Sequence, residues 1–252
     1  NEHVRSVREL KVAAETLNVK SIPTQAPLVD GYRIFYWHKG YRGYPGGDFI
    51  DFVQVDSRYC FAFLGDIMGK KWKAWFFTFG FLSYIRAAIR FCVLDQDFEL
   101  IRIVQKINKL IYLDESLQNI LSSLSLLLLD THTGEVHYTG AGDLPLVGYS
   151  PETDKTTTIQ STGLLLGLLE DGLYDKQVVA MKSGDQLAIF TDGMIDIPSN
   201  GAKKSDYPFF VEKITPYLGK PDSFGLIRKH VLELIDDSNQ MDDASIIFIE
   251  KQ

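Results

Sequence analysis

Four short motifs in this chain place aspartates beside turns. They are Gly46-Gly47-Asp48-Phe49, Gly65-Asp66-Ile67-Met68-Gly69, Thr191-Asp192-Gly193 and Asp242-Asp243-Ala244-Ser245. Each motif stands where an apolar, strand-like run meets a turn, so the sequence predicts that the carboxylates meet at one edge of a sheet.

Aspartate oxygens are the ligands that Mg²⁺ and Mn²⁺ prefer, and a cluster without His or Cys favours these ions over zinc or copper. Two such ions that share a carboxylate activate a water and neutralise a phosphoryl group during in-line attack, which indicates hydrolysis of a phosphate ester. Taken singly, each motif is also ordinary turn chemistry, because Gly and Asp favour turns. Four motifs in this order and context favour the metal site.

The order of the motifs resembles the bacterial SpoIIE-type (RsbU-like) serine phosphatases of the metal-dependent PP2C (PPM) superfamily. That family has GGDF-x-D, GD-x-x-GKG, an AGH turn, a hydrophobic strand into TDG, and a final DD-x-T or DD-x-S strand. The resemblance extends from residue 28 to residue 249. The matching segments are residues 46–51, 65–70, 141–143, 190–193 and 242–245.

The resemblance implies a catalytic set of four aspartates and two Mn²⁺ or Mg²⁺ ions. Asp66 would bridge both ions, and the Ile67 carbonyl would contact one of them. Asp192 and Asp242 would complete the ligands of one ion. Asp48 would orient metal-bound water, directly or through a neighbouring group. The residues in supporting places are Gly47, Gly65, Gly193 and Asp243.

Two segments depart from the family pattern. GKG becomes Gly69-Lys70-Lys71, followed by Trp72, and AGH becomes Ala141-Gly142-Asp143. Neither change removes an implied metal ligand. The phosphate-clamping residue is not ranked by the sequence, although we favour Lys70. The basic residues nearest the motifs are Lys70, Arg42 and Arg33.

The activity that the resemblance implies is hydrolysis of phosphoserine or phosphothreonine on a protein by a metal-activated water. The implied substrate is a phosphorylated STAS-domain anti-sigma-factor antagonist in a bacterial partner-switching pathway, and the implied regulator is an upstream sensory or response-regulator domain. The alternative is a degenerate phosphatase fold that acts as a binding or regulatory module. The altered turns motivate this alternative, and the four retained aspartates argue against it.

Length and composition fit one enzyme-sized domain. The chain has 252 residues, of which 45% are hydrophobic. Its net charge of −7 argues against a nucleic-acid surface. Cys60 and Cys92 lie in apolar runs, which is typical of buried thiols in a reducing compartment, so we expect a cytoplasmic protein. The five histidines show no metal-ligand spacing and are interpreted as surface or satisfied residues.

Hydrophobic periodicity predicts the elements that position the motifs. Asp95 or Asp97 is the expected N-cap of the helix that begins at residue 98. The predicted helices are 3–17, 71–91, 98–112, 207–217 and 224–235. The predicted strands are 32–37, 49–55, 59–64, 125–130, 135–139, 145–149, 156–159, 177–180, 186–191 and 244–249.

Runs of strands and pairs of helices predict an α+β layered fold with mostly antiparallel sheets. The resemblance implies the α/β/β/α sandwich of PP2C phosphatases over residues 28–252. Residues 1–27 would be an N-terminal helix and connector, either ordinarily packed or coupling an upstream regulatory domain. The apolar residues 74–85 are too few to span a membrane and predict a buried helix. The oligomeric state stays open, a homodimer included.

Overall fold

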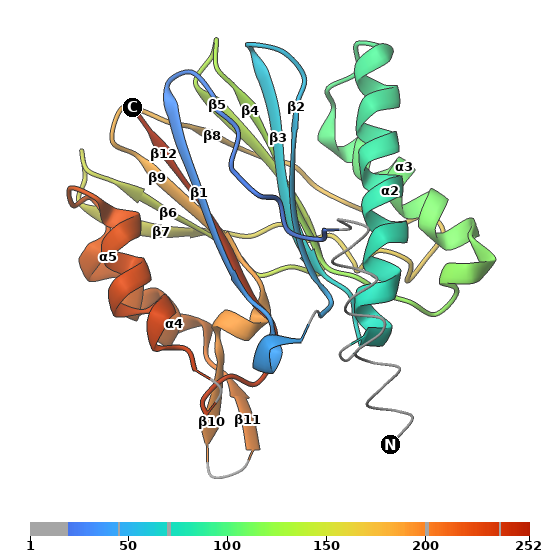
Figure 1. The fold of residues 1–252 in the computed structure, drawn as a ribbon. Coiled ribbons are helices and arrows are strands. Elements are labelled where there is room, and N and C mark those ends of the chain that lie inside the picture. The colour runs from blue at the N-terminus through green and yellow to red at the C-terminus, as the bar shows by residue number, and fades with distance from the viewer. Residues whose placement is uncertain (1–19, 45, 70–71, 200–201, 237) are drawn as a thin grey trace.

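The computed structural model describes residues 20–252 except 45, 70–71, 200–201 and 237. In this part of the chain, two five-stranded sheets lie face to face, and a pair of helices covers the outer face of each sheet (Figure 1). The predicted α+β sandwich of two antiparallel sheets is therefore confirmed. The helix predicted at residues 3–17 lies outside the described residues.

The first sheet has the strand order β1-β12-β9-β6-β7. Every neighbouring pair in it is antiparallel. The interior strand β12 is buried on both faces over its first six residues, which explains its unbroken apolar run. The strands are β1 (Tyr32–Lys39), β6 (Leu146–Ser150), β7 (Lys155–Ile159), β9 (Gln186–Phe190) and β12 (Ala244–Lys251).

The second sheet has the order β2-β3-β4-β5-β8 and is also antiparallel throughout. Its register sets Asp48, the first residue of β2, directly opposite Asp66, the last residue of β3. Two of the four acidic motifs therefore share one end of this sheet. The strands are β2 (Asp48–Gln54), β3 (Tyr59–Asp66), β4 (Leu124–Asp130), β5 (Glu135–Ala141) and β8 (Gln177–Ala180).

The helices form two pairs, as predicted. Helices α2 (Trp72–Leu94) and α3 (Leu100–Leu113) cover the second sheet, and α4 (Tyr207–Ile214) and α5 (Ser223–His230) cover the first (Figure 1). The N-cap of α3 is Glu99, so the prediction of Asp95 or Asp97 was wrong. Asp97 instead accepts the backbone N–H of Glu99 at 3.0 Å, and it stands two residues before the N-cap.

A hairpin of β10 (Asp196–Ser199) and β11 (Ala202–Ser205) follows the third motif and was not predicted. Proline cannot donate a ladder hydrogen bond and is rare in strands. Pro198 therefore argued against a strand at this position, and β10 was not predicted. The helices predicted at 207–217 and 224–235 also end early. Each passes into a short 3₁₀ helix, η4 (Thr215–Tyr217) after α4 and η5 (Leu232–Leu234) after α5.

Helix α2 is long and strongly apolar. By length and composition alone, its segment Ala74–Leu94, which is longer than the predicted run 74–85, could cross a membrane. A core helix passes the same test, and one face of α2 is buried against the second sheet. Arg86, which interrupts the run, donates through Nε to Asp51 of β2 at 2.6 Å and so joins the helix to the sheet.

Three apolar layers hold the sandwich together, one between the sheets and one under each helix pair. Full burial of a large apolar side chain contributes about 1.5–3 kcal/mol, so these layers supply the main driving force for folding. Leu64 and Ile247 are buried between the sheets. Phe81 and Ile107 are buried under α2 and α3, and Phe210 and Ile227 are buried under α4 and α5.

Residues 20–27, the described part of the predicted connector, are joined to both sheets. Ile50 of β2 donates its N–H to the carbonyl oxygen of Ser21 at 3.0 Å. The hydroxyl of Tyr36 on β1 donates to the carbonyl oxygen of Pro23 at 2.6 Å. Ile22 and Ala26 pack against the layer between the sheets. This part of the connector is therefore packed on the sandwich.

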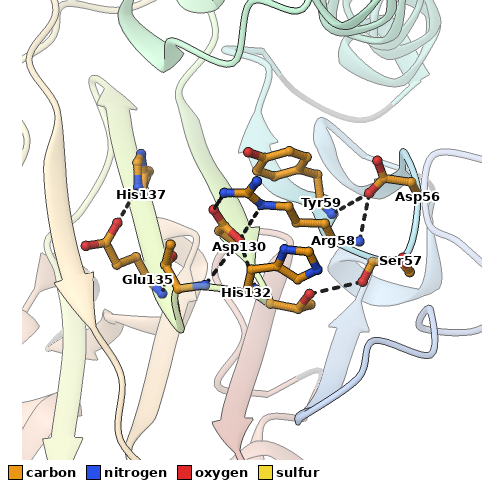
Figure 2. A network of polar contacts seen from close by, with 10 residues as sticks. Asp56, Ser57, Arg58, Tyr59, Asp130, His132, Glu135 and His137 are labelled. Atoms are coloured by element: carbon orange, nitrogen blue, oxygen red, sulfur yellow. Dashed lines mark hydrogen bonds and ion pairs between the residues drawn. The ribbon is translucent and has the colours of Figure 1, made fainter.

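An ion pair closes the end of the second sheet away from the acidic motifs. Figure 2 shows Arg58, between β2 and β3, with Nε and Nη2 donating to the two Asp130 oxygens of β4 at 2.9 and 2.7 Å. Hydrogen bonding from Arg58 lowers the pKa of Asp130 to about 2. His132 is exposed and His137 lies 3.2 Å from Glu135, so both fit the expectation of surface or satisfied histidines.

The buried side chain of Asn108 on α3 holds the middle of the loop that follows β7. Its Nδ2 donates to the carbonyl oxygens of Leu169 and Glu170 at 2.8 and 3.0 Å. Its Oδ1 accepts the N–H of Gly167 at 2.9 Å. One residue therefore satisfies three backbone groups that the loop cannot pair within itself.

Asn108→Ala should lower the free energy of unfolding by about 3 kcal/mol, because three backbone groups lose their partner. Urea denaturation followed by circular dichroism measures this. Gln105→Ala, an exposed position on the same helix, is the matched control and should change stability by less than about 0.5 kcal/mol. Equal midpoints for the two variants would show that Asn108 does not hold the loop.

Candidate metal centre

The four acidic motifs meet at one end of the sandwich, where both sheets contribute. Asp48 and Asp66 come from β2 and β3 of the second sheet. Asp192 follows β9 and begins the 3₁₀ turn η3 (Asp192–Met194), and Asp242 precedes β12, the neighbour of β9 in the first sheet. The sequence-predicted acids are therefore brought together from facing sheets.

The carboxylates are close enough to change one another's protonation. Burial first, and then the charges of Asp48, Asp192, Asp242 and Asp243, raise the pKa of Asp66 well above its ordinary value. Burial and the charge of Asp243 also raise the pKa of Asp48. Like charges in a desolvated site repel, and a bound cation relieves that repulsion.

Asp48 has one oxygen held and one open. Its Oδ2 accepts the hydroxyl of Thr191 at 2.9 Å and that of Ser245 at 2.5 Å. Its Oδ1 is buried and has no hydrogen-bond partner among the residues that the structure describes. A buried carboxylate oxygen without a partner is costly, and a cation or an ordered water satisfies it.

These residues fit a hard divalent cation by donor chemistry, because the converging groups are carboxylate oxygens. Among the described residues, no group of three or more His, Cys, Asp or Glu side chains already stands where it could hold a metal ion. The fit is therefore one of oxygen donors and uncompensated charge, not of ligand distances.

Two glycines allow the backbone to approach the acids. A Cβ at Gly47 would lie 2.5 Å from the carbonyl oxygen of Ile67 and 2.6 Å from Asp66 Oδ1. A Cβ at Gly193 would lie 1.8 Å from the carbonyl oxygen of Asp243. All three distances are too short for a real side chain, so the close approach requires glycine at both positions.

Asp243 is tied to the loop of the first motif. Its Oδ1 accepts the N–H of Tyr41 at 2.7 Å, and its Oδ2 accepts the N–H of Gly47 at 2.9 Å. The backbone N–H of Asp243 in turn donates to Asp242 Oδ1 at 3.0 Å. Asp243 therefore holds the loop in place, which fits the supporting position expected for it. Gly65 directly precedes Asp66 on β3.

The three basic candidates lie in different places. Arg33 is ion-paired with Glu250 near the start of β1, roughly 16 Å along the strand from the acidic end, so the structure does not bring it to the aspartates. Arg42 is exposed in η1 (Tyr41–Gly43), beside the backbone that Asp243 binds, with its Cζ 5.1 Å from the Tyr41 ring centre. Lys70 lies outside the described residues.

His38 was not predicted as a site residue, yet the structure connects it to the acids. Its Nδ1 lies 2.9 Å from Ser245 Oγ, whose hydroxyl donates to Asp48. Burial lowers the pKa of His38 to about 4. The signal is the antiparallel register of β1 and β12, which sets His38 opposite Ser245 and which the spacing of residues in one sequence does not reveal.

Asp143, which stands where the family has histidine, is hydrogen-bonded away from the four motif aspartates. Its Oδ2 accepts the hydroxyls of Ser125 at 2.5 Å and Tyr138 at 2.7 Å, which ties β4 to β5. Burial raises the pKa of Asp143 to about 6. The departure from the AGH pattern is therefore accommodated by a hydroxyl pair inside the second sheet.

The two antiparallel five-stranded sheets with a helix pair on each outer face form the fold of PP2C-type domains. The family model described as stage II sporulation protein E (SpoIIE) matches residues 56–252. The chain belongs to the SpoIIE family. No curated protein matches the sequence significantly.

Solved structures share this fold. The PP2C phosphatase domain and a fragment of the regulatory domain of SpoIIE from Bacillus subtilis align with a TM-score of 0.70 and 16% identity, over 89% of this chain and 64% of that one. The RsbU and RsbW domains of a Mycobacterium tuberculosis protein align with a TM-score of 0.73 and 16% identity, over 92% and 63%. This chain therefore spans less than two thirds of either structure.

A third solved structure of this fold contains metal. The catalytic domain of the serine/threonine protein phosphatase PstP, in complex with two manganese ions, aligns with a TM-score of 0.61 and 16% identity, over 87% of this chain and 97% of that one.

Asp66→Asn should stabilise the metal-free protein at pH 7 by about 1–2 kcal/mol, because it removes one charge from a repelling cluster. Mn²⁺ should raise the melting temperature of the parent and have little effect on the variant. Thermal denaturation in EDTA and in Mn²⁺ measures both effects, with the exposed Asp95→Asn as control. Equal stabilisation of parent and Asp66→Asn by Mn²⁺ would remove Asp66 from the ligands.

Asp143→Asn should change how stability depends on pH. The folded-state pKa of about 6 lies above the ordinary value, so the folded protein keeps this proton while the unfolded chain loses it. Stability from this group is present below about pH 4 and is lost as the pH rises through 6. Relative to the parent, the variant should gain up to about 3 kcal/mol between pH 4 and pH 7.

Urea denaturation at pH 4, 5.5 and 7 measures this difference. Asp130→Asn is a control of opposite sign. The pKa of Asp130 is lowered to about 2, so its carboxylate stabilises the fold at pH values above the ordinary pKa of aspartate. A difference between Asp143→Asn and the parent that stays constant across this pH range would contradict the assignment.

Proposed function

We propose that this chain is a metal-dependent protein phosphatase that hydrolyses phosphoserine or phosphothreonine with two Mn²⁺ or Mg²⁺ ions. The observation that carries the proposal is the meeting of four aspartates from two sheets at one end of the sandwich, where burial and their charges raise the pKa of Asp66. Membership of the SpoIIE family and the two manganese ions in the similar PstP catalytic domain support it.

Asp48, Asp66, Asp192, Asp242 and the carbonyl of Ile67 are the groups that would hold the ions. When bound, the ions lower the pKa of a water and neutralise charge on the phosphoryl group. Asp48 would orient the attacking water, because the hydroxyls of Thr191 and Ser245 hold its other oxygen and leave Oδ1 as an acceptor.

The two cysteines are poor candidates for a covalent nucleophile. Cys60 and Cys92 are both buried, and burial raises the pKa of the Cys60 thiol to about 12. The thiolate is the nucleophilic form, and it would be scarce at neutral pH. Direct attack by water on phosphorus therefore fits these residues better than a two-step route.

The substrate would be a protein. We propose a phosphorylated STAS-domain anti-sigma-factor antagonist in a cytoplasmic partner-switching pathway, with control by a regulatory domain upstream of residue 28. The similar Mycobacterium tuberculosis structure, which joins an RsbU domain to an RsbW domain, supports this class of partner. Of the three basic candidates, Arg42 is exposed in η1 next to Tyr41, whose N–H binds Asp243, and we propose that it meets the phosphate.

The test is phosphate release from a phosphoserine STAS-domain protein and from p-nitrophenyl phosphate, with Mn²⁺ or with EDTA. Turnover should need the metal. Asp192→Asn should lower kcat by about a thousandfold, since a bound ion contributes several kcal/mol to the transition state. Asp95→Asn, a matched exposed change away from the motifs, should behave like the parent.

A cooperatively folding protein that releases no phosphate with Mn²⁺ or Mg²⁺ would contradict the proposal. That outcome would favour the binding or regulatory module, because the acidic end would then be retained without catalysis. Turnover of p-nitrophenyl phosphate without turnover of the phosphoprotein would keep the phosphatase and reject the proposed substrate.

A further inference from the structure

We propose that His38 positions Asp48 for metal binding through the hydroxyl of Ser245. This inference rests on the proposed metal centre and concerns a residue that belongs to none of the four motifs. His38 lies on β1, the edge strand of the first sheet, whereas Asp48 begins β2 of the second sheet. The connection between them therefore crosses from one sheet to the other.

The direction of each hydrogen bond follows from the chemistry of the groups. In the ionised form that binds a cation, the Asp48 carboxylate is acceptor-only, so the Ser245 hydroxyl, 2.5 Å from its Oδ2, must then donate to it. That hydroxyl has one proton, so towards His38 Nδ1, at 2.9 Å, it must accept. The hydrogen-bond chain therefore runs from His38 Nδ1–H to Ser245 and from Ser245 to Asp48.

The tautomer of His38 is fixed by this chain. Burial keeps the ring neutral at pH 7, so it has a single N–H, and the chain requires that N–H on Nδ1. Without this donor, the Ser245 hydroxyl would lose its partner and could rotate away from Asp48. His38 thus acts on Asp48 through Ser245, because it directs the proton of the Ser245 hydroxyl towards the Asp48 carboxylate.

A second hydroxyl completes the hold on Asp48. Thr191 donates to the same Oδ2 at 2.9 Å, and its Oγ1 accepts the backbone N–H of Ser245 at 3.0 Å. Both donors therefore occupy Oδ2, and Oδ1 is left without a partner within the described part of the chain. Groups of this kind behind a metal ligand set its orientation, and their loss typically costs about 10–100-fold in metal affinity.

The test is Mn²⁺ affinity measured by isothermal titration calorimetry on the metal-free protein. His38→Leu removes the donor at similar size and should weaken Mn²⁺ binding by about tenfold. His38→Asn keeps an N–H donor close to the position of Nδ1 and should bind Mn²⁺ within about threefold of the parent. His38→Gln carries its amide one carbon further and should resemble His38→Leu.

A double-mutant cycle with Ser245→Ala separates positioning from simple packing. If His38 acts through Ser245, adding His38→Leu to Ser245→Ala should weaken Mn²⁺ binding no further. Melting in EDTA checks that each variant folds. Should His38→Leu fail to fold, the His38→Gln and His38→Asn pair makes the same comparison.

A folded His38→Leu with the Mn²⁺ affinity of the parent, or additive losses in the cycle, would overturn the inference. The outcome of these Mn²⁺ titrations is separate from that of the phosphatase assay. A parent that binds Mn²⁺ but releases no phosphate would reject the proposed activity and leave the role of His38 standing. A parent that binds no Mn²⁺ would reject both.

Discussion

Negative charge buried between two sheets is the constraint on which the rest of this structure depends. Burial and mutual repulsion raise the pKa values of Asp48 and Asp66. A fold that only needed stability would replace such acids or pair them with cations. The neighbouring elements instead hold the acids together: hydroxyls occupy one oxygen of Asp48, and Gly47 and Gly193 admit close backbone contact.

The two ends of the second sheet show how the buried acids affect folding stability. At the far end, Asp130 has a two-pronged Arg58 partner and a lowered pKa, so its charge stabilises the fold. At the site end, Asp66 has a raised pKa, so its charge opposes folding. The apolar layers and the Arg58–Asp130 ion pair therefore have to offset the charge repulsion at the site. This is expected for a functional site built on a stable fold.

Sequence reading reached the parts of this structure that are local. Strands are short alternating or apolar runs, so the strands that end at Asp66 and precede Asp192 were predicted close to their observed bounds. The β10–β11 hairpin was missed because Pro198 hides it. The link from His38 to Asp48 depends on strand register and on the stacking of two sheets. These are long-range relations that the periodicity of one chain does not contain.

Asp143 shows how a departure from the family pattern can be tolerated near an acidic site. A carboxylate in place of an imidazole could add a negative charge to the end of the molecule where the acidic motifs already repel one another. Its Oδ2 is instead occupied by Ser125 and Tyr138, and its pKa of about 6 keeps part of the population protonated near neutral pH. The charges that raise the pKa of Asp66 come from Asp48, Asp192 and their neighbours, so the replacement leaves the balance of the metal centre to the motif aspartates.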